Sequence, residues 1–161
     1  MMNKGILSSI TTGNYILFFI SAILDRALKI CAIFLWQNNT IQLRPWLFFS
    51  LEKNIGLAWG LGSTTSVYGQ YFFSIIMLLA LLFVARKAVL NWCKNVSIIG
   101  EIFILIGGTS NLLDRVFYGS VIDFIQIFIG NYRLSVFNLA DVYIAIGLYI
   151  LFRKTSYDSI Y

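Results

Sequence analysis

Four long apolar runs divide this 161-residue chain, and they restrict its fold more than any other feature of the sequence. Each run approaches the roughly 20 apolar residues that a helix needs to cross a hydrocarbon core of about 30 Å. Hydrophobic residues make up 59% of the chain and the mean hydropathy is +0.81, values that are not typical of soluble globular proteins. The sequence therefore predicts an all-α membrane protein with four transmembrane helices in contact with membrane lipids. The runs cover approximately residues 14–36, 68–85, 96–113 and 137–152.

The connections at residues 37–67 and 114–136 are long enough to form structure outside the bilayer. The first contains short apolar pieces interrupted by Pro45 and by glycines, and the second contains Gly130-Asn131, which has the chemistry of a hairpin turn. We therefore expect a small extracytoplasmic β-sheet beside the helices. With a single proline and no low-complexity tract, the chain is expected to form one membrane-embedded domain, residues 1–161. The apolar pieces are residues 41–43, 47–60, 127–129 and 134–137.

Basic residues concentrate at two ends of the expected spans. Arg86, Lys87 and Lys94 lie in the short connection 86–95, and Arg153 and Lys154 follow the last span. Because cytoplasmic ends of membrane helices are enriched in Lys and Arg, both termini are expected to be cytoplasmic and the two long connections external. The net charge of +5 is then explained mainly by the basic residues that orient the membrane spans, and no nucleic-acid partner is expected.

The chain contains no histidine, which removes whole classes of catalytic site. Ser-His and Cys-His nucleophilic catalysis both require an imidazole, and so do most zinc sites. No metal and no cofactor is expected. Any hydrolytic chemistry is therefore expected to come from carboxylates.

Four aspartates lie in or beside the expected spans, towards their outer ends. A charge at membrane depth costs free energy, so each one is a candidate functional residue. The alternative is that they only join helices or mark the ends of spans. Taken together the four form a pattern that favours function. They are Asp25, Asp114, Asp123 and Asp141.

Two of these aspartates follow an asparagine by three residues, in Asn111–Asp114 and Asn138–Asp141. On a helix this spacing places both side chains on one face, so each Asn-x-x-Asp unit is expected to point inward.

Two charge pairs are also expected from spacing. Asp25 and Lys29 are four residues apart on the first helix, which favours a neutralising structural ion pair. Arg115 follows Asp114 directly and is interpreted as its charge partner.

Two carboxylates close together near the outer interface, partly shielded from water, share one proton because two close like charges do not both ionise readily. One then acts as a general base on water, while the protonated one polarises the scissile carbonyl and later protonates the leaving amine. This is the chemistry of an aspartic protease.

Five motifs in order resemble those of the bacterial lipoprotein signal peptidases (signal peptidase II). The resemblance covers nearly the whole chain, and five ordered motifs are far more specific than any single one. The last two carry the positions of the family's catalytic aspartates, Asp123 and Asp141. The motifs are Asp25–Lys29 (DRALK), Asn54–Gly60 (NIGLAWG), Gly107–Arg115 (GGTSNLLDR), Gly119–Phe124 (GSVIDF) and Phe137–Asp141 (FNLAD).

The resemblance implies an activity, partners and a location. It implies cleavage of prolipoprotein signal peptides just before a diacylglyceryl-modified cysteine, by an intramembrane aspartic endopeptidase of the bacterial inner membrane with its site near the outer face. It also implies sensitivity to globomycin-type inhibitors and a flexible flap around Asn54, and a monomer is expected. Residues implied to line or brace the site are Asn54, Asn111, Asp114, Arg115 and Asn138.

Four positions depart from the family pattern: Arg26 in place of Gln, Trp59 in place of Phe, Ser110 in place of Gly, and Val142 in place of Ser. None is a member of the catalytic pair. Their effects on packing of the glycine-rich helix face, and on affinity for substrate or inhibitor, are left open by the sequence.

Three other functional classes are consistent with buried carboxylates. A small membrane transporter or channel subunit uses them as an ion path, although four short spans leave little room for one. A non-catalytic scaffold uses polar residues to join helices, but it does not explain the ordered motifs. A presenilin-like or prepilin-type protease is not favoured, because the chain has no Gly-x-Gly-Asp sequence.

Overall fold

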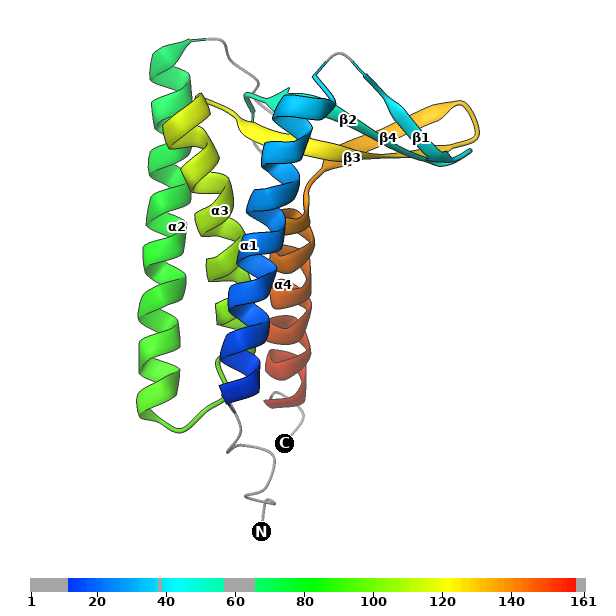
Figure 1. Cartoon of the computed structure of the whole chain (residues 1–161). Coiled ribbons are helices and arrows are strands. Elements are labelled where there is room, and N and C mark those ends of the chain that lie inside the picture. The colour runs from blue at the N-terminus through cyan, green and yellow to red at the C-terminus, as the bar shows by residue number, and fades with distance from the viewer. Residues whose placement is uncertain (1–11, 38, 57–65, 159–161) are drawn as a thin grey trace.

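Four helices pack side by side, and a four-stranded sheet covers one end of them (Figure 1). The computed structural model describes residues 12–37, 39–56 and 66–158. Residues 57–60 of the NIGLAWG motif, including Trp59, and the part of the expected flap that follows lie outside the described residues. The helices are α1 (Thr12–Leu35), α2 (Val67–Cys93), α3 (Ile99–Tyr118) and α4 (Leu139–Asp158); the strands are β1 (Ile41–Arg44), β2 (Leu47–Asn54), β3 (Val121–Ile129) and β4 (Tyr132–Phe137).

Three helices extend beyond the ends that the apolar runs indicated, and α4 ends at Asp158 and not near residue 152. α2 ends at Cys93 and not near Ala85, so most of the expected basic connection 86–95 is helical. Lys and Arg have favourable helix propensity, and hydropathy detects the apolar span, not the whole helix. α3 continues to Tyr118, so that the residues expected to begin a loop at position 114 belong to a helix. Gly119 ends α3 with a φ of 69°, a left-handed conformation that glycine adopts without strain.

Among the described helices, α2 alone is long and apolar enough to be identified as a membrane span by length and composition. Its large side chains are widely exposed, for example Phe83 at 66% and Leu79 at 60%. The other three helices carry charged residues, which a hydropathy criterion counts against a span.

α3 packs closely against both α2 and α4 through adjacent glycines. A Cβ atom at Gly107 would overlap the backbone carbonyl oxygen of Ala140 in α4, and one at Gly108 would lie 2.5 Å from a methyl carbon of Leu81 in α2. Small residues at such crossings let helix backbones approach, as is common for helices in membranes.

The sheet has the strand order β1-β2-β3-β4 with antiparallel neighbours. The hairpin expected at Gly130-Asn131 is confirmed, since it connects β3 to β4. Pairing of β2 with β3, from Leu47 with Ile127 to Asn54 with Val121, joins the two long connections into one sheet. The sheet is thus larger than expected, because most of residues 114–136 was interpreted as loop.

The end of α1 packs against one face of this sheet and fixes its position over the helices. Ala32 forms a buried cluster with Ile122 and Phe124 of β3, and the ring of Trp36 stacks on Phe49 of β2 with centroids 5.1 Å apart. Successive side chains of a strand point to opposite faces. Asp123, between Ile122 and Phe124, is therefore directed away from this apolar cluster.

Candidate active site

Asp123 and Asp141 reach one cavity from different elements. Asp123 belongs to β3 and Asp141 to the first turn of α4, and both line a cavity of about 580 Å³. Asp123 is only 2% exposed. The remaining lining is largely apolar and comes from α2, α4 and the sheet: Met77, Val121, Val136, Phe137, Val142, Ile144, Ala145 and Leu148, with Asn54, Asn111 and Arg115 as the other polar residues.

Asn138 and Asp141 form a reciprocal cap at the start of α4. The backbone N–H of Asp141 donates to Asn138 Oδ1 at 2.9 Å, and the backbone N–H of Asn138 donates to Asp141 Oδ2 at 3.2 Å. This is the arrangement of a capping box, with Asn and Asp in the two positions. The Asn-x-x-Asp spacing therefore arises from a helix start, and it places the Asp141 carboxylate where the helix dipole favours negative charge.

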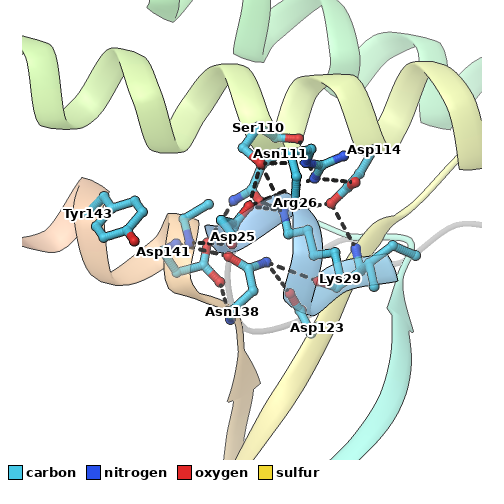
Figure 2. A network of polar contacts seen from close by, with 12 residues as sticks. Asp25, Arg26, Lys29, Ser110, Asn111, Asp114, Asp123, Asn138, Asp141 and Tyr143 are labelled. Carbon is cyan, nitrogen blue, oxygen red and sulfur yellow. Dashed lines mark hydrogen bonds and ion pairs between the residues drawn. The ribbon is translucent and has the colours of Figure 1, made fainter. Parts of the chain in front are cut away.

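Both oxygens of Asp123 accept hydrogen bonds from asparagine amides. Asn138 Nδ2 donates to Oδ1 at 2.6 Å, and Asn54 Nδ2 donates to Oδ2 at 3.2 Å. Each amide is oriented by a donor to its own oxygen, because the backbone N–H of Gly56 donates to Asn54 Oδ1 at 3.0 Å while that of Asp141 donates to Asn138. Asn138 therefore contacts both carboxylates of the pair (Figure 2).

A third asparagine, Asn111 of α3, holds Asp141. Its Nδ2 donates to Asp141 Oδ1 at 2.8 Å, and its Oδ1 accepts a hydrogen bond from Lys29 Nζ at 2.7 Å. Together with the bonds described above, each of the four carboxylate oxygens of the pair accepts at least one hydrogen bond from the protein.

Burial raises the pKa of the Asp123 carboxyl to about 7, and the neighbouring charge of Asp141 acts in the same direction. Hydrogen bonds from Asn54 and Asn138 oppose this increase by stabilising the ionised form. A carboxyl group with such a pKa holds a proton near neutral pH and is suited to general acid catalysis.

We expect kcat/KM to fall as the pH rises through about 7, because Asp123 is protonated below its raised pKa and loses that proton above it. Replacing Asn54 with alanine removes a hydrogen bond that lowers the pKa of Asp123, so the alkaline limb of the profile should move to higher pH. Initial rates measured from about pH 5 to about pH 9 test both statements, since the pKa in question is about 7. An alkaline limb that Asn54→Ala leaves unmoved is inconsistent with Asp123 as the titrating group.

Asp25 and Asp114 lie beside the cavity and hold the backbone next to each member of the pair. Asp25 Oδ1 accepts a hydrogen bond from the backbone N–H of Ala140 at 3.0 Å, and Asp114 Oδ2 accepts one from that of Ile122 at 3.2 Å. Both carboxylates are completely buried. These contacts support an architectural function of Asp114, which connects α3 to the strand that carries Asp123.

Two cations of α1 neutralise these buried carboxylates. Lys29 Nζ lies 3.2 Å from Asp25 Oδ2 and 2.7 Å from Asp114 Oδ2, and Arg26 Nη2 lies 2.6 Å from Asp114 Oδ1. The ion pair expected between Asp25 and Lys29 is present, as part of a larger group. Ser110 completes it, with its hydroxyl donating to Asp25 and accepting from Arg26 Nε at 3.1 Å (Figure 2).

The interpretation of Arg115 as the charge partner of Asp114 was wrong. Both ion pairs of Asp114 within the described residues are to α1, whereas Arg115 Nη2 donates to the carbonyl of Gly56 and its guanidinium lies 5.9 Å from the ring centroid of Phe73. Consecutive residues on a helix point in different directions, so sequence adjacency does not bring the two charges together.

Comparison with known proteins agrees with this arrangement. The model of the signal peptidase (SPase) II family matches residues 17–156, which include every residue of the site. The chain belongs to the signal peptidase II family. Lipoprotein signal peptidase of Wigglesworthia glossinidia brevipalpis is 38% identical over 114 residues, which are 70% of this chain and 73% of the relative.

Other relatives of the signal peptidase II family extend the similarity over more of the chain. Lipoprotein signal peptidase of Hydrogenovibrio crunogenus is 31% identical over 154 residues, covering 93% of this chain and 87% of that protein. A bacterial membrane enzyme solved by the in meso method at 2.3 Å resolution has a TM-score of 0.70 and 27% identity, with 92% of this chain and 90% of that chain covered. The family match identifies a protease and gives no support to the transporter or channel alternative.

Two residues of the charged group in this signal peptidase II chain were not predicted to have a function. Arg26 and Ser110 were noted only as departures from the family pattern, yet they contact each other through a bond from Arg26 Nε to Ser110 Oγ and one from Nη2 to the Ser110 carbonyl at 3.2 Å. A signal was present, because a second cation three residues before Lys29 lies on the same helix face and requires a second buried anion.

Proposed function

We propose that this chain cleaves the signal peptide from prolipoproteins just before a diacylglyceryl-modified cysteine, with Asp123 and Asp141 as an aspartic catalytic pair. The observation that carries the proposal is the pair of carboxylates at one cavity, each held at both oxygens by hydrogen-bond donors. The relatives with this name supply the substrate class. Sensitivity to globomycin-type inhibitors and function as a monomer remain expectations from the sequence.

In the proposed mechanism one water molecule lies between the two carboxyl groups. Asp141, at the start of α4 and bonded to Asn111, remains ionised and removes a proton from the water as it attacks the scissile carbonyl carbon. Asp123 donates its proton to the carbonyl oxygen, which gives a tetrahedral intermediate. The C–N bond breaks as Asp141 passes the proton taken from the water to the leaving amine, and a hydroxyl of the intermediate returns its proton to Asp123 as the new carboxyl product forms. No metal takes part, so the proposal predicts that a chelator leaves the activity unchanged.

The cavity has the composition that such a substrate requires. Its polar residues lie at the carboxylate pair, while Val142, Ile144, Ala145 and Leu148 extend an apolar lining along α4. An apolar signal-peptide helix can pack on this lining while its scissile bond reaches the pair. Arg115 also lines the cavity, and its buried Nε and Nη1 atoms have no hydrogen-bond partner within the described structure.

Cleavage of a purified substrate tests the proposal. The protein is incubated in detergent with a diacylglyceryl-modified prolipoprotein, and release of the signal peptide is measured by mass spectrometry. Cleavage immediately before the modified cysteine is the expected result. The same prolipoprotein without the diacylglyceryl group serves as the control, and equal cleavage of both would contradict the substrate assignment.

A topology with four membrane spans and both chain termini in the cytoplasm is also part of the proposal. The first residues of α1, the last of α4 and the α2–α3 connection lie at the end opposite the sheet (Figure 1). A reporter inserted after Lys94 is expected to be cytoplasmic, and one inserted in the Gly130-Asn131 turn is expected to be external. Detection of the Lys94 reporter outside the membrane would reverse the orientation.

A further inference from the structure

Lys29 contacts three groups that each hold either one member of the carboxylate pair or the backbone directly before one. It is 1% exposed, and its Nζ atom lies 3.2 Å from Asp25, 2.7 Å from Asp114 and 2.7 Å from Asn111 Oδ1. The Ser110 hydroxyl oxygen lies farther from Nζ, at 3.4 Å, so the three donors of the ammonium group face four acceptors, of which these three are the closest. The hydrogen bonds of Lys29 fix the position of these three partners relative to one another.

The two carboxylates bound by Lys29 hold equivalent points of the backbone. Asp25 accepts from the N–H of Ala140, the residue immediately before Asp141, and Asp114 accepts from the N–H of Ile122, the residue immediately before Asp123. The ammonium group therefore joins the anchor of α4 to the anchor of β3. Those are the two elements whose relative position sets the separation of Asp123 and Asp141.

The third partner of Lys29 is Asn111, and the contact concerns the orientation of its side-chain amide. Asn111 donates from Nδ2 to Asp141, and this orientation turns its Oδ1 to the other side, towards a donor. Lys29 is that donor. Without it, Oδ1 loses this hydrogen bond, and the amide is held in this orientation only by its bond to Asp141.

We infer that Lys29 is a positioning residue for catalysis, which fixes both the separation of the two carboxyl groups and the direction of the Asn111 amide. The inference rests on the proposed roles of Asp123 and Asp141. It goes beyond the neutralising ion pair with Asp25, because neutralisation alone requires neither the Asn111 contact nor the link between the two anchors.

Arg26 provides a matched comparison on the same helix. It also forms an ion pair with Asp114, at 2.6 Å, but it lies 3.8 Å from Asp25 and its side chain is 30% exposed. The hydrogen bonds of Arg26 within the described structure are to Ser110 and Asp114, not to Asn111. Arg26→Met and Lys29→Met therefore each remove one positive charge from Asp114, and only the second removes the contact with Asn111.

The test compares kcat and KM of the two variants, measured per folded enzyme, with Lys154→Met at the far end of the bundle as a neutral control. Lys29→Met should lower kcat by about a hundredfold, since a displacement of about 1 Å in a catalytic group has an effect of that size. KM should stay within about twofold, because no substrate contact is removed. Arg26→Met should lower kcat by less than about fivefold, as expected for a partly exposed charge contact.

A double-mutant cycle separates orientation from general stability. If Lys29 acts partly through Asn111, the loss caused by Lys29→Met should be clearly smaller in an Asn111→Ala background. Equal losses in the two backgrounds, or equal effects of Lys29→Met and Arg26→Met on kcat, overturn the inference. Failure of the proposed function is distinguishable, because it shows as turnover by Asp141→Asn irrespective of Lys29.

Lys29→Met leaves a buried negative charge without its partner, which lowers the stability of the fold, so a compensated variant is tested beside it. This variant is Asp25→Asn/Lys29→Met, which removes both charges and keeps an oxygen that accepts from the backbone N–H of Ala140. A folded double variant with reduced kcat and unchanged KM supports the inference. A folded double variant with full kcat overturns it.

Discussion

Replacing either Asp123 or Asp141 with asparagine is expected to lower kcat by at least about a thousandfold, because the proposed mechanism gives each carboxyl group a separate proton-transfer function. In each variant an amide NH2 group replaces an oxygen that accepts a hydrogen bond. A decrease of about 1–2 kcal/mol in the free energy of unfolding should accompany the change, and the fold should remain. Rates of signal-peptide release by purified, folded protein are the measurement.

Glu52→Gln is a matched control for the carboxylate pair. Glu52 lies opposite Asp123 in the β2–β3 register, but its carboxylate is directed to a surface ion pair with Arg133 at 2.9 Å. This variant should retain its activity. The Asp123→Asn/Asp141→Asn double variant should lose little more than either single variant, because residues that act as a unit are not additive. Appreciable turnover by Asp141→Asn, or activity that a chelator abolishes, contradicts the mechanism.

The second large effect is expected on stability, from Gly107→Ala. The new Cβ atom would overlap the backbone carbonyl oxygen of Ala140 and lie 2.9 Å from Cγ1 of Ile144. A backbone group cannot move aside as a side chain does, so α3 and α4 must separate, at a cost of about 3 kcal/mol or more. The separation also displaces the start of α4, which carries Asp141. Thermal unfolding in detergent and cleavage rates should therefore both decrease.

Two further substitutions on α3 calibrate this effect. Gly100→Ala meets the Gly147 carbonyl and Leu151 at 3.0 Å, a milder contact that should lower the unfolding midpoint less than Gly107→Ala. Thr109→Ala changes an exposed position two residues further along the helix and should leave the midpoint nearly unchanged. A Gly107→Ala protein as stable as Thr109→Ala would contradict the close packing of α3 on α4.

The helices could be anticipated because apolar runs and turn residues act locally. The Gly130-Asn131 hairpin was predicted for the same reason. The pairing of β2 with β3 could not be predicted, since register depends on contacts between segments far apart in the chain. The ends of α2 and α3 differ because charged residues that hydropathy assigns to loops are stable in helices when they reach water, as Arg86 can, or are neutralised, as Asp114 is.

The residues of the candidate site could be proposed from the sequence, but their hydrogen-bond and ion-pair partners could not. The spacing of Asn138 and Asp141 indicated a shared helix face, whereas in the structure it is a reciprocal cap at the helix start. Adjacency suggested that Arg115 neutralises Asp114, whereas the neutralising cations come from α1. Both differences arise because partners on other helices compete with neighbours in sequence, and a single sequence does not contain those distances.

The orientation of the three asparagines has a consequence for where a proton can be located. Asn54, Asn111 and Asn138 all present NH2 groups to the pair, and the backbone of Asn138 adds another N–H. All of these groups are hydrogen-bond donors, so none of them can accept a hydrogen bond from the O–H of a protonated carboxyl group. In the proposed mechanism the proton shared by the pair is then confined to the side that faces the cavity or to the space between the two carboxyl groups. A ligand with a hydroxyl group placed there can both donate to the ionised carboxylate and accept from the protonated one, whereas a ligand with only a carbonyl oxygen can do the second alone.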